Sequence, residues 1–170
     1  MNETKIFLNT WGAYNDGCIG YGWMTPDEAR NFIEEDEERD GGEWFIADID
    51  NYLGVDFGSL EYCNVMGIID TIEELEAMTE WQLEEIGAIM EAHGGSVSEA
   101  IEAQKEGRYI YYSGRTIKEL AYELAEDTIA CYTHGGKIPE FFTQYFDYEA
   151  YARDLEDDYI ETSNGCITRY

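Results

Sequence analysis

The chain of 170 residues carries 38 Asp and Glu against 10 Lys and Arg, which gives a net charge of −28 at pH 7. A surface of this charge repels nucleic acids and anionic membranes, so we expect neither as a partner. Hydrophobic residues make up 44% of the sequence, which predicts a folded core and excludes wholesale disorder.

The sequence shows no export signal and no membrane segment. Residues 1–10 lack a basic start followed by an apolar run. No stretch approaches the roughly 18 apolar residues of a membrane helix. The cysteines are widely spaced, which is typical of reduced thiols in the cytoplasm: Cys18, Cys63, Cys131 and Cys166. We therefore expect a cytoplasmic protein.

Residues 1–60 are predicted to form a small αβ module. A strand is expected over residues 5–11, a loop over 12–22 and a second strand over 43–50. Between them, Thr25, Pro26 and Glu28 have the pattern of a helix that begins with a capping box. This helix is predicted to run to about Arg39.

Residues 61–106 are predicted to form a helical module. Three segments have the pattern of a capped helix start, at residues 70–73, 79–82 and 96–99. Gly94-Gly95 and Gly107 are expected to end two of these helices. Each helix is short and must pack on another element to be stable.

Residues 107–170 are predicted to form an α+β module. A strand over 108–113 precedes a helix from Thr116 to about Tyr132, whose residues Ile117, Leu120, Ala121, Leu124 and Thr128 share one side. A break follows at Gly135-Gly136 and Pro139. A helical stretch from Pro139 into residues 147–156 and a hairpin across residues 163–165 complete the module. The fold class is therefore α+β, with three small modules and short antiparallel sheets.

Negative charge is spread over all three modules. The excess of acids over bases is 11 in residues 1–60, 11 in residues 61–106 and 6 in residues 107–170. Acid pairs four residues apart on helices, such as Glu119 and Glu123, cost a few tenths of a kcal/mol each. Because the sequence keeps these unfavourable pairs, we infer that the negative electrostatic field of the protein has a function. For comparison, 28 charges correspond to about 48 Å of duplex DNA, or roughly 14 base pairs.

No constellation of residues predicts catalysis, a cofactor or a metal. Asp48, Asp50 and Asn51 resemble the start of a calcium loop, but the required Gly and Glu are missing at its sixth and twelfth positions. Cys131 and His134 supply two ligands where structural zinc needs four, and His93 is isolated. We therefore expect a protein that is not an enzyme and binds no cofactor.

Several stretches together resemble the ArdA antirestriction family. Residues 6–17, followed by Gly20 to Trp23, are similar to that family's opening strand, Tyr-Asn-x-Gly loop and Gly-x-Trp. Phe45-Ile46-Ala47-Asp48 is similar to a second marked segment. Residues 138–140 and 145–155 carry the closest similarity. After Asp48 the sequence departs from the family, because Ile49-Asp50 replaces an aromatic residue and Glu.

The resemblance implies an elongated homodimer that mimics B-DNA. Such a protein occupies the DNA-binding groove of a type I restriction–modification enzyme, both methyltransferase core and full complex, and protects incoming mobile DNA. Carboxylates would then take the place of phosphates. The acids expected to do so are Glu34, Glu35, Asp36, Glu37, Glu38, Glu73, Glu74, Glu80, Glu84, Glu85, Glu119, Glu123, Glu126 and Asp127.

Aromatic residues in the predicted strand over 108–113 supply a second candidate site. Tyr109 and Tyr111 are expected on one face of the strand, and Ile110 and Tyr112 on the other. Base stacking is not expected, because aromatic platforms for nucleic acids come with basic grooves. We expect one face to be buried, and Tyr109, Tyr111 and Tyr112 are candidates for a dimer contact.

Two other functions are compatible with the sequence. An acidic chaperone-like protein would bind basic or other DNA-binding proteins generally. An acid-rich hydrolase adapted to a salt-rich cytoplasm would instead need a concave pocket with two carboxyl groups of raised pKa.

Overall fold

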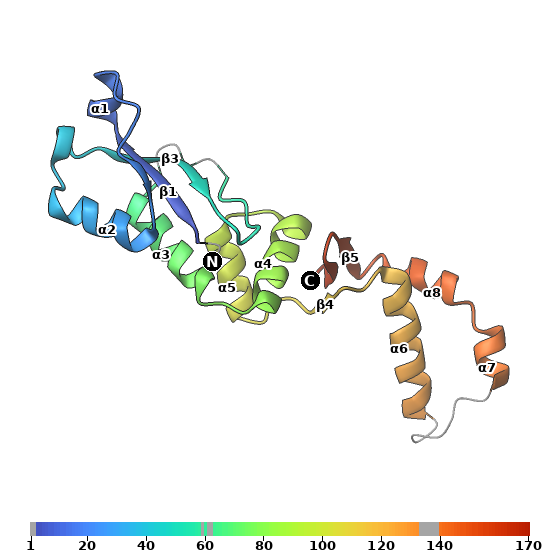
Figure 1. Cartoon of the computed structure of the whole chain (residues 1–170). Helices are drawn as coiled ribbons and strands as arrows, with labels where there is room; N and C mark the ends of the chain where they lie inside the picture. Colours follow the sequence, from blue (N-terminus) through green and yellow to red (C-terminus); the bar gives the residue numbers. More distant parts are fainter. Residues whose placement is uncertain (1–2, 59, 61–62, 133–139) are drawn as a thin grey trace. The chain divides into compact units, whose positions relative to one another are not determined.

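The computed structural model describes residues 3–58, 60, 63–132 and 140–170. Among these residues it contains eight α-helices and two three-stranded antiparallel sheets, which confirms the α+β fold (Figure 1). Its contacts separate two compact units. The first unit comprises Met1–Leu83 and Ser96–Ser98, and the second comprises Glu84–Gly95 and Glu99–Tyr170. The division into three modules stays a prediction.

The sheet of the first unit has the order β2-β1-β3, with β1 (Lys5–Thr10) between β2 (Gly22–Met24) and β3 (Trp44–Asp50). Both predicted strands are confirmed. The expected loop over residues 12–22 is partly wrong, because α1 (Trp11–Asn15) begins directly after β1. The Thr10 side chain caps this helix by accepting a hydrogen bond of 3.2 Å from the Ala13 amide.

Helix α2 (Pro26–Glu35) begins with the predicted capping box. The Thr25 hydroxyl accepts from the Glu28 amide, and the Glu28 carboxylate accepts from the Thr25 amide. The helix ends at Glu35, before the predicted Arg39, and the run of acids at residues 34–38 is unfavourable beside the negative pole of the helix. A short 3-10 helix, η1 (Arg39–Gly41), follows.

Helix α3 (Val65–Glu76) begins earlier than its predicted start at residues 70–73, which is therefore wrong. Asn64 caps it by accepting from the Gly67 amide at 3.2 Å. Thr71 lies inside the helix, and its hydroxyl donates back to the Gly67 carbonyl at 2.8 Å instead of capping. Apolar side chains of α2 and α3 form one core with one face of the sheet: Ile6, Leu8, Ala29, Ile33, Ile46, Val65, Ile69 and Ile72.

Two further helix starts and both glycine stops of the predicted helical module are confirmed. Helix α4 runs over Glu80–His93 and helix α5 over Val97–Lys105. Gly94, Gly95 and Gly107 follow them with positive φ.

The sheet of the second unit has the order β4-β6-β5. The predicted hairpin is confirmed as β5 (Tyr159–Thr162) and β6 (Gly165–Thr168). Strand β4 (Tyr111–Ser113) is shorter than the predicted 108–113. The reason is that the Arg108 amide still bonds to the Ala103 carbonyl at 3.0 Å and so completes the end of α5.

Three helices belong to the C-terminal part of the second unit: α6 (Ile117–Tyr132), α7 (Glu140–Tyr145) and α8 (Tyr148–Leu155). The predicted end of α6 at Tyr132 is confirmed. Leu120, Ala121 and Ala125 are its buried residues, and Tyr122 stacks on Tyr148 of α8 at 4.1 Å between ring centres. The predicted break at Gly135, Gly136 and Pro139 lies outside the described residues.

None of the helices in the described part of the chain is long and apolar enough to cross a membrane.

Candidate acidic binding surface

The longest acidic run of the chain, residues 34–38, is exposed throughout. Glu34 and Glu35 end α2, while the other three acids lie in the turn that follows, so the prediction that the whole run is helical is wrong. The Asp36 carboxylate lies 3.4 Å from Nε of Arg39. Within the described residues, no ion pair involves the other four acids. Their charges therefore face solvent.

A second group of exposed acids lies along one side of α6. Glu119, Glu123, Glu126 and Asp127 are all exposed, and their spacing of four, seven and eight residues places them on one side of the helix. We call these four residues the α6 ridge. Glu119 also caps the helix, and hydrogen bonds from the backbone and side chain of Thr116 lower its pKa. Glu123 lies 3.0 Å from Nε of Arg115.

The five predicted acids of the middle region are placed differently from one another. Glu80 is exposed at the start of α4, whereas Glu73 and Glu74 of α3 are half-buried. Glu73 pairs with Arg30 at 2.9 Å, so its charge is partly balanced. Glu84 is half-buried and accepts a hydrogen bond of 2.7 Å from the Ser113 hydroxyl.

The structure does not place Glu85 on an acidic surface. Its side chain belongs to the buried part of α4, with only 6% of the residue exposed. Burial raises the pKa of Glu85, and a hydrogen bond from Gln104 opposes that shift. A buried carboxyl group cannot present its charge to a partner as a phosphate does. The sequence did not predict that Glu85 is buried, because Glu84 and Glu85 are adjacent acids on one helix.

Helix α4 is tied to the sheet of the second unit by polar side chains. Besides the bond from Ser113 to Glu84, the Glu91 carboxylate accepts from the Ser163 amide and hydroxyl, which lowers the pKa of Glu91. Nε2 of His93 lies 3.0 Å from the Thr168 carbonyl. The Glu84 and Glu91 carboxylates thus accept from β4 and from the hairpin turn, so these two acids have a structural role.

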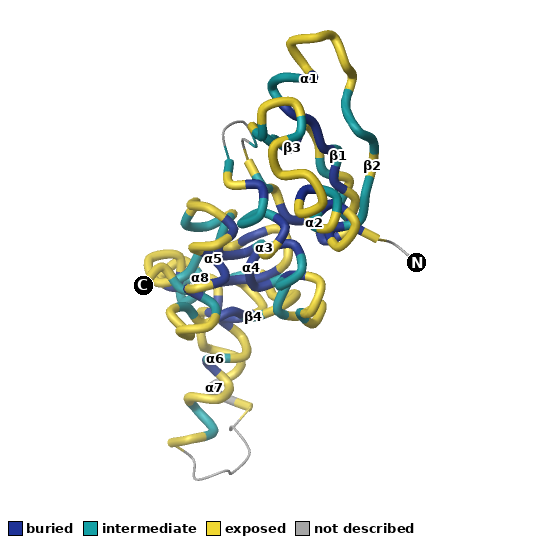
Figure 2. The backbone as a smooth tube through the Cα atoms, turned by 90° about the vertical axis from the view of Figure 1, so that its left-hand side faces the viewer, coloured by how far each residue is buried: buried dark blue, intermediate teal, exposed yellow. Residues whose placement is uncertain are grey.

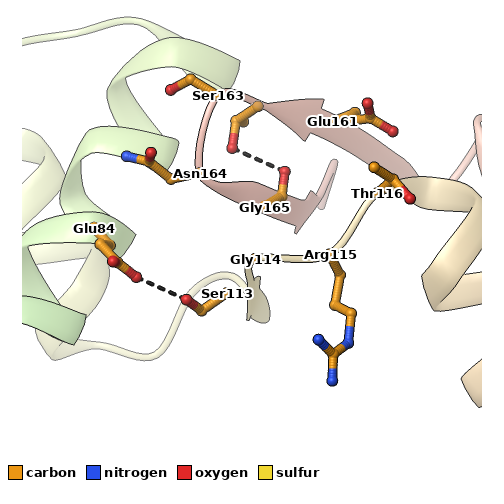
Figure 3. A pocket seen from close by; sticks show the side chains of 10 residues that line it. Glu84, Ser113, Gly114, Arg115, Thr116, Glu161, Ser163, Asn164 and Gly165 are labelled. Carbon is orange, nitrogen blue, oxygen red and sulfur yellow. Dashed lines mark hydrogen bonds between the residues drawn. The ribbon is translucent and has the colours of Figure 1, made fainter.

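An open depression of about 410 Å³ lies beside these contacts (Figure 3). Its lining includes Glu84, Arg115 and Glu161, together with the turn of the hairpin. Glu161 accepts from the Ile117 amide at 2.8 Å and thereby holds the start of α6. Glu85 does not line this depression. The carboxylates here serve as hydrogen-bond acceptors within the second unit.

The three candidate tyrosines each contact a neighbour within the second unit. Tyr111 is buried, and its hydroxyl donates to the Asn164 carbonyl at 2.7 Å. Tyr109 is half-buried and stacks on His93 at 4.1 Å between ring centres. Tyr112 packs edge-on against Tyr159 at 5.9 Å. Their role in a dimer contact stays a prediction.

Sequence reasoning missed a group of aromatic side chains on the first unit. The core occupies one face of its sheet, and on the other face Phe7 pairs with Trp23 at 5.2 Å between ring centres. Phe45 stacks on Trp11 at 4.4 Å, and Tyr14 lies against both rings. The alternation of Phe7 with the buried Ile6 and Leu8 was the available signal.

The exposed acids of residues 34–38 and of the α6 ridge form two acidic groups on a strongly acidic α+β protein, and one acid in each group, Asp36 and Glu123, is paired with an arginine. The chain matches the family model of ArdA, described as antirestriction protein, over residues 6–168. It therefore belongs to the ArdA family of antirestriction proteins. A comparison with curated proteins gives no match.

Proposed function

We propose that this antirestriction protein acts as a mimic of B-DNA that occupies the DNA-binding groove of a type I restriction–modification enzyme. It would thereby block the action of that enzyme on incoming mobile DNA. The α6 ridge is the observation that carries the proposal. Its four acids span residues 119–127, or about 12 Å of helix, which averages about 4 Å of axial rise between successive charges. One strand of B-DNA has a phosphate every 3.4 Å or so along its axis.

The physical gain is the same as for DNA. A groove that binds phosphates carries Lys and Arg, and opposite potentials steer the two proteins together. Bound ions are released when the carboxylates replace the phosphates, so affinity should fall as salt rises. The run at residues 34–38 adds four acids without an ion pair among the described residues, and these raise the field of the first unit.

A competition experiment tests the proposal. The protein is titrated into a type I methyltransferase core that holds a labelled DNA duplex, at low and at moderate salt. We expect stoichiometric displacement that weakens with salt. Folded protein that displaces no DNA at micromolar concentration would refute this target.

A pair of variants separates an ordered mimic from a generally acidic binder. E123Q/E126Q/D127N neutralises three acids of the α6 ridge and leaves the Glu119 cap intact. D154N/E156Q/D157N removes the same charge from exposed acids of α8 and the segment after it. Exposed ion pairs contribute about 0.2–1 kcal/mol each, so the ridge variant should displace DNA roughly 3- to 150-fold less well. An equal loss in both variants, with equal binding to polylysine, would favour the general acidic binder.

The homodimer is part of the same proposal. Ile110 is largely exposed beside the half-buried Tyr109 and Tyr112, which supports a contact between two copies at this strand. Sedimentation of the wild-type chain and of Ile110→Asp tests it. We expect the wild-type chain to be a dimer and Ile110→Asp to be a monomer. A variant that remains a dimer would show that the dimer contact does not include Ile110.

A further inference from the structure

We propose that the face of the first unit's sheet opposite its core, where Tyr14 and Trp23 are exposed, docks arginine side chains of the enzyme that the acidic surface attracts. This face, which we call the aromatic face, consists of Phe7, Trp11, Tyr14, Trp23 and Phe45. The inference rests on the proposed function and deepens it, because it adds a surface that recognises the partner through more than charge.

Strand register places Phe7, Trp23 and Phe45 on one side of the sheet, and the rings of Trp11 and Tyr14 in α1 pack against Phe45. Phe7 of β1 is directly opposite Trp23 of β2, and Asn9 of β1 is opposite Phe45 of β3. Since side chains of directly opposed residues share a face, the three strand rings lie away from the core formed by Ile6 and Leu8, with the buried Asn9 between them. Tyr14 remains 57% exposed and Trp23 46% exposed. In Figure 2 the segment between α1 and β2 is drawn largely as exposed.

The aromatic face is held in place before any partner arrives. The Asn9 amide group donates to the Cys18 carbonyl at 3.4 Å, which ties the segment after α1 to the central strand. Gly20 lies so close to Phe7 that a Cβ there would stand 2.5 Å from its ring. Rings fixed in this way lose little entropy on binding, which is why Trp and Tyr dominate interface hot spots.

Carboxylates border the rings. Asp48 is directly opposite Phe7 in the sheet and exposed. Asp16 is the C-cap of α1, the helix that carries Trp11 and Tyr14, and it is exposed. The first unit has three cations for 20 acids, so positive charge has to come from outside.

Guanidinium is the group that suits this surface. It is planar, stacks on aromatic rings and pairs with carboxylates at the same time, whereas an ammonium group is more strongly hydrated. The first unit already uses this chemistry internally. The Arg39 guanidinium lies 4.4 Å from the centre of the Phe32 ring, and its Nε lies 3.4 Å from Asp36. Enzymes that grip DNA phosphates present arginine in their grooves, so they carry the matching group.

A second copy of the chain fits this face poorly. The same face of a second copy would bring its own Asp16 and Asp48 against these carboxylates, and like charges at close range oppose association. A partner with exposed arginines reverses the sign of that interaction.

The test uses the full chain and two peptides of equal charge, hexa-arginine and hexa-lysine. Binding is followed through the indole N–H resonances of the four tryptophans. We expect hexa-arginine to shift the Trp23 resonance and to bind more tightly than hexa-lysine. Trp23→Ala and Tyr14→Ala should each weaken hexa-arginine binding by roughly 2- to 30-fold. Trp81→Ala, an exposed tryptophan on α4 rather than on this face, is the matched control and should leave binding unchanged.

Equal affinity for the two peptides, with the Trp23 resonance unmoved, would overturn the inference. Sedimentation that shows dimer loss in Trp23→Ala would also overturn it, since a second copy would then occupy the face. The competition experiment on the methyltransferase core keeps the two proposals apart. If Trp23→Ala displaces DNA as well as wild type does while the α6 ridge variant does not, DNA mimicry stands and arginine docking falls. If hexa-arginine binds at Trp23 but no DNA is displaced, arginine docking on the aromatic face is supported and the type I enzyme is refuted as the target.

Discussion

The two units are both built around a three-stranded antiparallel sheet, but their central strands differ. In the first unit β1 alternates only over its first half, where Ile6 and Leu8 are buried and Phe7 is half-buried on the opposite face, whereas Asn9 and Thr10 are both buried. In the second unit β6 is covered on both sides, since Gly165, Cys166 and Ile167 are all buried. The first sheet therefore leaves only part of its second face accessible, at Phe7 and the exposed Trp23, whereas the central strand of the second sheet is buried within its own unit.

The acids of the two units also differ in use. The first unit has 20 acids and 3 bases, and the second has 18 acids and 7 bases. In the second unit, Glu84, Glu91 and Glu161 accept hydrogen bonds that fix α4, the hairpin turn and α6. Negative charge in this protein therefore serves both as a binding field and as scaffold. A sequence count does not distinguish the two uses.

The largest expected effect comes from truncating one core residue in each unit. Ile69 and Leu120 are both fully buried, so Ile69→Ala and Leu120→Ala should each lower the free energy of unfolding by about 2–5 kcal/mol. All four tryptophans belong to the first unit, so their fluorescence reports its unfolding.

Hydrogen exchange of β6 amides reports the second unit in the same urea series. We expect Ile69→Ala to move the fluorescence transition more than Leu120→Ala does, and the reverse for β6 exchange. Equal shifts of both signals in both variants would mean that the units unfold together.

A smaller effect is expected from two glycine substitutions. A Cβ at Gly12 would lie 1.9 Å from the Asp40 carbonyl oxygen, so the backbone has to shift in Gly12→Ala. We expect a loss of about 2 kcal/mol or more in the urea transition of the first unit. Gly87 in α4 has nothing within 4 Å of its Cβ position, so Gly87→Ala should instead stabilise its helix by up to about 1 kcal/mol. Destabilisation by both would show that the local space at Gly12 does not control its effect.

Local signals in the sequence were sufficient for most helix and strand positions. The capping residues Thr25 and Thr116 and the hairpin turn at residues 163–165 act through neighbours in the chain, and each was predicted correctly. The predicted start at residues 70–73 failed because the same residue types also fit a helix interior, where Thr71 bonds to the preceding turn.

The candidate surface was harder to predict because exposure depends on tertiary packing. Residues 34–38 and the α6 ridge are exposed as expected, but Glu85 is buried one residue away from Glu84. Which side of α4 packs inward is decided by elements distant in the sequence. The aromatic face was missed for a related reason, since Trp11 and Tyr14 join Phe45 only after α1 turns back over the sheet.

Removing one helix cap from each unit should have an effect of moderate size. Thr25 and Thr116 each accept from the amide three residues on, and both satisfy a carboxylate in return. We expect Thr25→Ala and Thr116→Ala to cost about 1 kcal/mol each in urea unfolding. The Ser variants keep the hydroxyl and serve as controls, so a loss as large in Thr→Ser as in Thr→Ala would rule out the cap as its cause.

The smallest expected effects contrast two acids on α4 within the second unit. Burial raises the pKa of Glu85 above its ordinary value of 4.5, so its ionisation opposes folding, and stability is lost as pH rises from 4.5 through the folded pKa. Hydrogen bonds from Ser163 lower the pKa of Glu91, so its ionised form supports folding, and stability is lost as pH falls from 4.5 through the folded pKa.

Glu85→Gln should therefore be more stable than wild type near neutral pH, with the gain vanishing in acid. Glu91→Gln should be less stable near neutral pH, with the loss vanishing in acid. Each difference should be smaller than the ~1 kcal/mol of a helix cap. Urea midpoints measured between about pH 3 and 7 check both signs, because the common effect of relieving the net negative charge cancels when each variant is compared with wild type at the same pH. If Glu85→Gln and Glu91→Gln shift stability in the same direction, the two acids do not have the opposite roles that their burial and hydrogen bonds indicate.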